Sequence, residues 1–463
     1  MSRTPPLSRR DFARAAFLFT AGVASGCSAE NNAGTPDTPG VPRLTSTPPS
    51  APHGVPRFPR IAACYLAQDV LPRPDQFADY DMVVIDSEWH GRLGRPYFDA
   101  LRTSNPDLCL LAYVNLVDYP LELGPIEEWS GRYALWQYDT PSRSRFPREW
   151  IATTAAGSPV SEWPGTQMTN LTDAAPRVGG LTFAEYAARW VVDRVWSTEV
   201  WDGIFLDVWG DRIWSADHTA WDYRLDGTDT PDLEIYGSES PWERGVNGAE
   251  IIMRAGMPGA VMVANGTRTM RAGQLNGRVW ENFLDWAKDP GRGLDLRTYA
   301  DQCASPSIRH PMYSMTIDTR GAARGSSDEF RRARYFLTAT LLQNGYWAAS
   351  ASSEYNSLLF YDEFDGAGLG RGYLGMPLVV NPDFARLSAP FGGGIGMAAP
   401  DVYRRDFETG IVLHNSGGAD RVVTFESPMR LLRGTQAPDI NSGAVIQSIT
   451  LGGHDGRVLL RTD

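Results

Sequence analysis

Eight short apolar segments recur along the chain between residues 61 and 349, and the stretches between them carry polar clusters and helical periodicity. Strands that are apolar along their whole length are buried on both faces, which is typical of parallel sheets covered by helices. Eight such strands alternating with helices predict an α/β fold, a closed (β/α)8 or TIM barrel with its helices outside. The predicted strands cover residues 61–66, 82–85, 108–114, 203–206, 260–264, 278–280, 312–317 and 346–349.

Two helices and two long loops are expected around these strands. Residues 183–196 carry an apolar stripe with a period of about 3.6 residues, which predicts a helix, and residues 328–343 are also suited to one. The stretches 116–180 and 211–250 are rich in Pro, Gly, Trp and Asp. We expect them to be elaborated loops, which in a barrel build the substrate site above the strand ends.

The pattern changes near residue 376 to short β-rich segments separated by glycine-rich turns. Turns of this composition join antiparallel strands. The sequence therefore predicts a barrel domain over residues 60–375 and a small C-terminal antiparallel β-sandwich over residues 376–463. The expected strands cover residues 402–407, 411–415, 421–426, 429–432, 444–451 and 457–461.

The N-terminal segment has the composition of an export signal. Arg9 and Arg10 precede an apolar stretch at residues 15–24. A positive region followed by a short apolar one is typical of a signal peptide, and the paired arginines indicate the twin-arginine route. A short amphipathic helix with incidental arginines is the alternative. We expect residues 1–27 to direct export to the cell envelope or the extracellular space.

The end of this segment resembles a bacterial lipoprotein cleavage box, with Cys27 as the residue that would be acylated. Ala24 stands where leucine is usual, which is a departure from the usual cleavage box. Residues 28–59 are rich in proline and cannot bury a core, so we expect a linker that holds the catalytic body off the membrane.

Charge and composition exclude several classes of partner. The chain of 463 residues has 43 Lys and Arg against 55 Asp and Glu, a net charge of −12. So acidic a chain is a poor match for nucleic acid or an anionic lipid surface, and we expect a monomer that binds neither. Its six histidines are scattered, and no two have metal-ligand spacing, so no metal and no cofactor are expected. Cys64, Cys109 and Cys303 predict no disulfide framework.

Polar and aromatic residues follow the predicted strands. Catalytic groups in a barrel project from the C-terminal ends of several strands, so these residues are the candidates for a site. Tryptophan stacks on the apolar face of a sugar, while carboxylates and amides bind its hydroxyl groups. The sequence thus predicts a site for a neutral polyhydroxylated ligand. The candidates are Asp86, Glu88, Trp89, His90, Asn115, Asp207, Trp209, Asp211, Asn265, Glu281, Asn282 and Asp318.

Several segments together resemble the TIM-barrel glycoside hydrolases of the hypothetical glycosyl hydrolase 15-like family, and less closely the endo-polygalactosaminidase-like barrels. The resemblance covers about residues 60–463. It implies that the Asp at the end of the fourth strand, Asp207, is the nucleophile, and that an acid from a later strand, Glu281, is the proton donor. The segments are residues 163–165, 170–172, 202–207, 279–282 and 405–410.

Glycoside hydrolysis needs one carboxylate that attacks or activates water and one carboxylic acid that protonates the leaving group. Asp207 lies among polar neighbours that favour its ionised form, whereas Trp280 and Phe283 flank Glu281 and would favour its neutral form. We therefore expect a retaining mechanism on a poly- or oligosaccharide, with the carboxyl groups about 5–5.5 Å apart, where about 6.5–9.5 Å would indicate inversion.

Structural roles for the same residues stay open. Asp207 could cap a helix or anchor a loop, and Glu281 or Asp318 could pair with an arginine. Glu88 and its neighbours could be rim residues. Two other functions are compatible with this pattern: a catalytically inactive carbohydrate-binding lipoprotein, and a metal-dependent hydrolase built on Asp86, Glu88 and His90.

Overall fold

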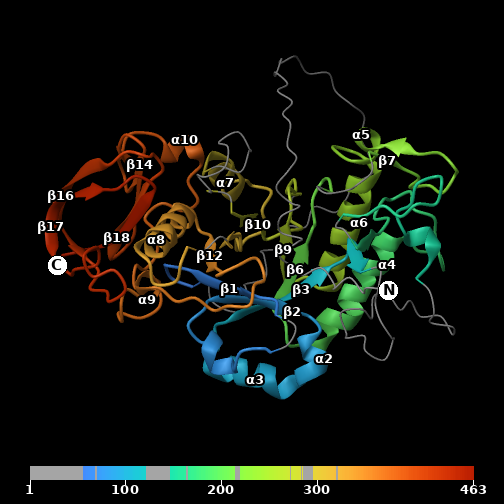
Figure 1. Cartoon of the computed structure of the whole chain (residues 1–463), viewed down its shortest axis with the longest axis horizontal. Helices are drawn as coiled ribbons and strands as arrows, with labels where there is room; N and C mark the ends of the chain where they lie inside the picture. The colour runs from blue at the N-terminus through green and yellow to red at the C-terminus, as the bar shows by residue number, and fades with distance from the viewer. Residues whose placement is uncertain are drawn as a thin grey trace, which may run out of the picture.

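The predicted barrel is confirmed. The computed structural model describes residues 56–67, 70–120, 146–162, 165–213, 219–271, 273–282, 284, 296–319 and 322–462. Eight parallel strands close into a barrel in the order β1-β12-β11-β10-β9-β6-β3-β2 (Figure 1). All eight lie where the apolar segments predict them. They are β1 (Ile61–Tyr65), β2 (Met82–Asp86), β3 (Cys109–Asn115), β6 (Gly203–Asp207), β9 (Val261–Asn265), β10 (Gly277–Glu281), β11 (Met315–Asp318) and β12 (Tyr346–Ala349).

Side chains of these strands alternate between two cores. In β2, Met82 and Val84 belong to the cluster inside the barrel, whereas Val83 and Ile85 belong to the cluster between the barrel and its helices. Successive strand residues point to opposite faces, so every second residue faces the barrel interior. Both faces are therefore apolar, and this explains the continuous apolar segments in the sequence.

Helices and two small two-stranded sheets, β4-β5 and β7-β8, surround the barrel. Residue 183 begins a helix as predicted, because Thr182 and Glu185 cap its first turn. The helix α6 was not predicted: residues 241–250 were expected in a loop, although Ser240 caps the first turn and Pro241 begins it. The elements are η1 (Pro74–Phe77), α2 (Trp89–Leu93), α3 (Arg95–Ser104), β4 (Asp118–Pro120), η4 (Arg148–Trp150), β5 (Thr166–Met168), α4 (Phe183–Trp190), η5 (Val191–Val195), η6 (Trp196–Thr198), β7 (Ala220–Trp221), β8 (Thr230–Pro231), α5 (Asp232–Ile235), α6 (Pro241–Gly256), α7 (Leu296–Cys303), α8 (Ser327–Leu341), α9 (Asp362–Asp365) and α10 (Phe384–Leu387).

The C-terminal strands form one six-stranded antiparallel sheet in the order β13-β14-β15-β18-β16-β17. The sheet curls around its own apolar cluster, which includes Val402, Leu413 and Phe425. Two predicted strands, 421–426 and 429–432, are a single strand with an irregular register, and β13 was not predicted. The strands are β13 (Ile395–Ala399), β14 (Val402–Asp406), β15 (Gly410–Asn415), β16 (Arg421–Leu431), β17 (Val445–Leu451) and β18 (Asp455–Arg461).

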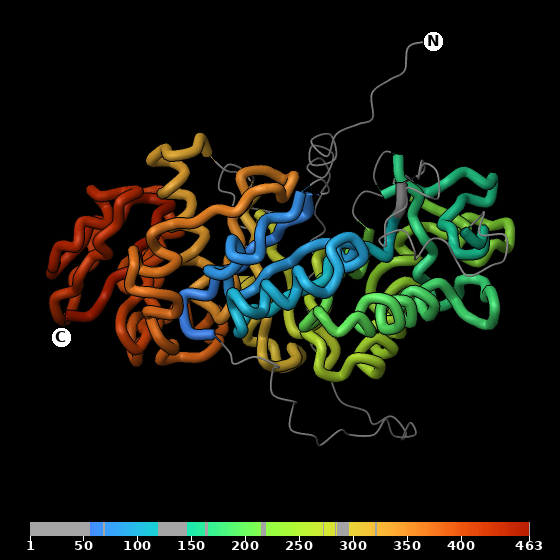
Figure 2. Tube along the Cα trace, turned by 90° about the horizontal axis from the view of Figure 1, so that it is seen from below, coloured from blue at the N-terminus to red at the C-terminus, as the bar shows by residue number. Residues whose placement is uncertain are grey.

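Buried arginines join this sheet to the barrel. Arg334 on α8 donates two hydrogen bonds to Asp455 on β18, at 3.0 and 3.2 Å. Arg405 on β14 donates to the Leu341 carbonyl and to Asn344, and burial lowers the pKa of Arg405 to about 9. The sheet lies at one end of the molecule, the barrel in the middle, and α4 and α6 at the other end (Figure 2).

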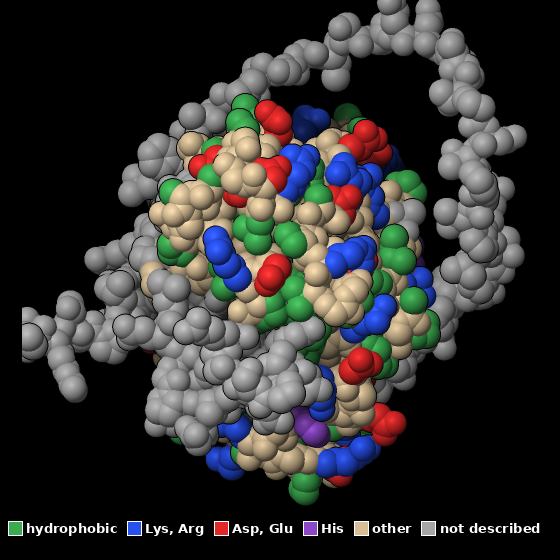
Figure 3. All heavy atoms as spheres, turned by 90° about the vertical axis from the view of Figure 1, so that its right-hand side faces the viewer, with side chains coloured by type: hydrophobic (Ala, Val, Ile, Leu, Met, Phe, Trp, Pro, Cys, Tyr) green, Lys and Arg blue, Asp and Glu red, His purple; other side chains and the backbone are tan. Residues whose placement is uncertain are grey.

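Charged side chains of both signs are interspersed over the face of the molecule near α4, with no broad field of one sign (Figure 3). Within the described ranges, no helix combines the length and apolar character needed to cross a bilayer. Cys64, Cys109 and Cys303 are buried thiols.

Breaking the joint between α8 and β18 tests how firmly the sheet is held. The substitution Asp455→Ala leaves Arg334 and Arg457 as buried charges that have lost the carboxylate they share, so we expect a loss of about 3–5 kcal/mol or more in the free energy of unfolding. Asp328→Ala is the control, because it breaks an exposed pair with Arg331 and should cost about 0–1 kcal/mol. Denaturant unfolding measures both, and equal losses would show that the buried pair does not hold the sheet.

Candidate active site

The carboxyl ends of the barrel strands place polar side chains at one mouth of the barrel. Alternation along the strands gives Asp86 the same face as Val84, Asp207 the face of Phe205, and Glu281 the face of Val279. These apolar neighbours all belong to the interior cluster. Asp86, Asp207, Asn265 and Glu281 therefore face inward where the interior core ends, as does Asn115 at the end of β3.

Asp207 is held by neutral donors. The Tyr113 hydroxyl donates to Oδ2 at 2.5 Å, Asn265 Nδ2 donates to Oδ1 at 2.9 Å, and the Val208 amide donates to Oδ1 at 3.0 Å. Tyr113 lies on β3 and Asn265 on β9, the two strands that flank β6. Within the described residues, no arginine forms an ion pair with Asp207, so its carboxylate is oriented without a fixed counter-charge.

Glu281 is bound by a tyrosine that no sequence motif indicated. The Tyr355 hydroxyl donates to Glu281 Oε1 at 2.5 Å. Tyr355 follows β12, at the carboxyl ends of the strands, and its ring packs against the interior cluster at that end of the barrel. Trp280, expected to shield Glu281, belongs instead to the helix-facing cluster on the opposite face of β10. The expectation that Trp280 desolvates the Glu281 carboxyl group is therefore wrong. Phe283, the other expected neighbour of Glu281, lies outside the described residues.

Tyr355 lies within range of both carboxylates. Burial raises the pKa of its phenol well above the usual value, and the charges of Glu281 and Asp207 raise it further. Asp207 and Glu281 come from β6 and β10, which are separated in the barrel by β9 alone. The structure thus brings the two predicted acids to the same side of the mouth, with the Tyr355 phenol bound to Glu281 and within electrostatic range of Asp207.

The candidates that follow β2 are divided between the mouth and the core. Asp86 is buried and its Oδ1 accepts a hydrogen bond from the Glu88 amide at 3.2 Å. Glu88 is also buried and pairs with Arg92 at 3.4 Å. Trp89 packs in the helix-facing core with Arg92 over its ring, and His90 lies against Phe98. Of this group, only Asp86 has a place on an inward-facing strand position.

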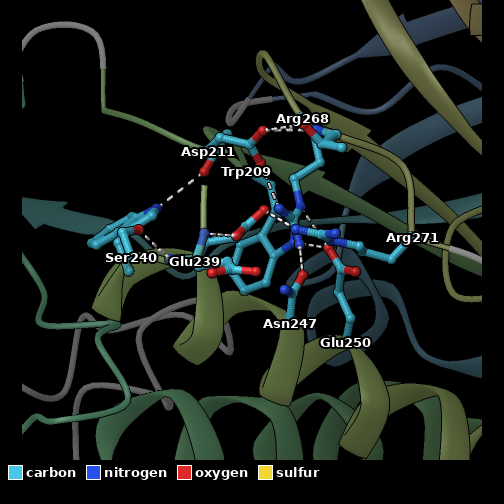
Figure 4. Close-up of polar contacts among 12 residues, drawn as sticks. Trp209, Asp211, Glu239, Ser240, Asn247, Glu250, Arg268 and Arg271 are labelled. Carbon is cyan, nitrogen blue, oxygen red and sulfur yellow. Dashed lines mark hydrogen bonds and ion pairs between the residues drawn. The ribbon is translucent and has the colours of Figure 1, made fainter. Parts of the chain in front are cut away.

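Trp209 and Asp211 lie behind the mouth. The indole of Trp209 is 1% exposed and donates to Glu250 on α6 at 2.9 Å. Arg268 donates to Glu250 at 2.9 Å and to Asp211 at 2.5 Å (Figure 4). Neither side chain is brought to Asp207 and Glu281. Their network instead fixes the loops that follow β6 and β9, the strands that carry Asp207 and Asn265.

Three further candidates bind their own neighbours. Ile317 points into the barrel interior, so the next residue, Asp318, points outward toward the helices. Arg332 on α8 donates two hydrogen bonds to Asp318, at 2.7 and 2.6 Å, so Asp318 forms an ion pair, which was the structural alternative to a sugar ligand. Asn282 exchanges hydrogen bonds with Thr319, both at 2.9 Å. Asn115 donates to Asp118 at 2.5 Å and accepts from the Val117 amide.

Within the described part of the chain, no group of three or more His, Cys, Asp or Glu residues could hold a metal ion. Cys27, the expected export signal and nearly all of the linker lie outside the described residues.

Several solved structures are similar to the chain at a low level. The glycoside hydrolase domain of PelA from Pseudomonas aeruginosa is 14% identical, with 64% of this chain and 96% of that chain covered and a TM-score of 0.38. An α-amylase from Geobacillus thermoleovorans is 10% identical, with 87% and 98% covered and a TM-score of 0.43. A β-L-arabinopyranosidase from Geobacillus stearothermophilus is 10% identical, with 87% and 97% covered and a TM-score of 0.42. No curated relative matches the sequence.

The family model of hypothetical glycosyl hydrolase family 15 matches residues 102–411, which is more than half of the chain. The match spans six of the eight barrel strands, from β3 to β12, and extends into β15. It includes both Asp207 and Glu281. The chain therefore belongs to hypothetical glycosyl hydrolase family 15 and is a glycoside hydrolase by class.

Proposed function

We propose that the protein hydrolyses O-glycosidic bonds of a poly- or oligosaccharide, with Asp207 as nucleophile and Glu281 as acid and base. The observation that carries the proposal is the position of these two carboxyl groups, which face inward at one barrel mouth on strands separated by β9 alone. Family membership supplies the reaction class.

The proposed reaction has two steps. An Asp207 oxygen bonds to the anomeric carbon while the bond to the leaving oxygen breaks, and that oxygen takes the proton of Glu281. Water then attacks the anomeric carbon, Glu281 takes a proton from the water, and Asp207 is released. A retaining enzyme of this kind requires the two carboxyl groups to lie about 5–5.5 Å apart.

Two tyrosines orient the reacting groups. Tyr113 and Asn265 fix the Asp207 carboxylate, and Tyr355 fixes that of Glu281. Because the pKa of Tyr355 is raised, its phenol keeps its proton and stays a hydrogen-bond donor through the neutral range. Asp86 is the further inward-facing group that we propose as a ligand of sugar hydroxyls.

Export belongs to the same proposal. A protein sent through the twin-arginine route and tethered by a proline-rich linker, with Cys27 as a site of acylation, would meet polysaccharides outside the cytoplasm. The amino-acid pattern of residues 1–59 supports this location.

A polysaccharide panel tests the two acids. Asp207→Asn should abolish hydrolysis, because an amide does not replace the attacking carboxylate. Glu281→Gln should lower kcat about 10²–10⁴-fold, and less with an activated leaving group that needs no protonation. Asp99→Asn and Glu199→Gln are matched controls, since both side chains are exposed and their ion pairs are with Arg95 and not with a mouth residue. Reducing-sugar release measures all five proteins.

Equal turnover by the wild type, Asp207→Asn and Glu281→Gln would show that neither side chain is the nucleophile or the acid. Oligosaccharide binding without hydrolysis by the wild type would favour a carbohydrate-binding protein instead.

The hydrogen bond from Tyr355 generates a separate prediction. Tyr355→Phe keeps the ring that covers the core and removes the donor to Glu281. Glu281 is a neutral acid at the start of the proposed reaction, and a hydrogen bond between neutral groups is worth about 0.5–1.5 kcal/mol, so we expect kcat/KM to fall about two- to tenfold. The melting temperature should change little. Unchanged kcat/KM at all pH values would show that Tyr355 does not orient Glu281 during the reaction.

A further inference from the structure

Glu162 is a buried carboxyl group that neither the sequence motifs nor the proposed reaction uses. Its side chain is 2% exposed, and Oε2 is buried with no hydrogen-bond partner within the described residues. Buried polar atoms in native proteins are nearly always paired, so an orphaned carboxyl oxygen requires an explanation.

Strand pairing connects the segment of Glu162 to β4, and Asp118 at the start of β4 is bound to the strand next to the one that carries Asp207. The adjacent Ser161 hydroxyl donates to the Thr166 carbonyl at 2.7 Å, and β5, which begins at Thr166, pairs with β4, which begins at Asp118. Asp118 accepts from Asn115, and Asn115 is the register partner of Asp207 across β3 and β6. Asp118 and Asp207 therefore lie on one sector of the mouth, and Glu162 lies in the segment that leads into β5, the partner strand of β4.

Charge in this sector is negative. Burial raises the pKa of Glu162 well above its usual value, and the charges of Asp118 and Asp207 raise it further. Among the described residues, the phenol of Tyr236 is also in range of Glu162, and burial raises the pKa of this phenol, so it is neutral. Within the described residues, no arginine forms an ion pair with Glu162. A neutral carboxylic acid is the form that this environment permits.

We propose that Glu162 is a positioning residue of the active site, a carboxylic acid that stays protonated so that Asp207 works without a further negative charge beside it. Its ionisation at high pH would bury an unpartnered charge next to Asp118 and Asp207 and disturb the orientation of the nucleophile. The catalytic consequence rests on the proposed function, whereas the protonation state does not.

Infrared titration of the full chain tests the protonation state directly. The wild type should show a protonated carboxyl band at neutral pH that is absent in Glu162→Gln. The titration midpoint of this band should move down by about one pH unit in Asp207→Asn and in Asp118→Asn, because each removes a neighbouring like charge. Asp328→Asn is the control and should leave the midpoint unchanged, since Asp328 lies on α8 and is exposed.

A band that survives in a folded Glu162→Gln, or a midpoint that ignores both neighbouring substitutions, would overturn the proposal. If Glu162→Gln does not fold, the titration midpoints of the carboxyl band in Asp118→Asn and Asp207→Asn still test the proposal, because Glu162 is intact in both variants.

Activity gives a second readout, once a substrate is known. Glu162→Gln has a neutral amide of the same shape in place of the carboxylic acid, and its pH profile is compared with that of the wild type. The fall of kcat/KM at high pH should move to higher pH, because the amide of the variant cannot ionise. An identical pH profile with full activity would contradict the positioning role. Absence of hydrolysis by every protein, with the infrared coupling present, would overturn the proposed function and leave the assignment of the buried proton standing.

Discussion

The alternation of side chains along eight parallel strands is the constraint on which the rest of the structure depends. Every second residue of a strand fills the barrel interior, and the remainder fill the layer beneath the helices. At the carboxyl ends the interior core stops, and the next inward position can carry a polar group. Asp86, Asp207 and Glu281 occupy such positions on three different strands. The packing of the barrel therefore gathers these carboxyl groups at one mouth.

Tyrosines connect this core to the carboxylates. Tyr113 belongs to the interior cluster and its hydroxyl reaches Asp207, while Tyr355 packs on the same cluster and its hydroxyl reaches Glu281. Each ring is fixed by apolar contacts, so each hydroxyl has a fixed position. Behind the mouth, the buried ionic network around Arg268 holds the loops after β6 and β9. The orientation of the two acids is thus set by core packing on one side and by this network on the other.

The sequence predicted the strands because their apolar segments are continuous, and it predicted the two acids of the mouth because both end such segments. It could also have excluded Asp318, since strict alternation along β11 turns this side chain toward α8. Trp209 was placed at the mouth for its position after a strand, but its indole is buried against α6. Tyr355 and Glu162 come from segments far along the chain. Their proximity to the acids depends on tertiary packing, which no local pattern contains.

The nucleophile is the central claim, and trapping the covalent intermediate tests it most directly. In Glu281→Gln, a glycosyl fluoride of the cleaved sugar can form the glycosyl-enzyme without an acid, but no base remains to activate water, so the intermediate should accumulate. Mass spectrometry of the digested protein should then find the sugar on Asp207. Consumption of the fluoride with no adduct, or with the adduct on another carboxylate, would contradict the account.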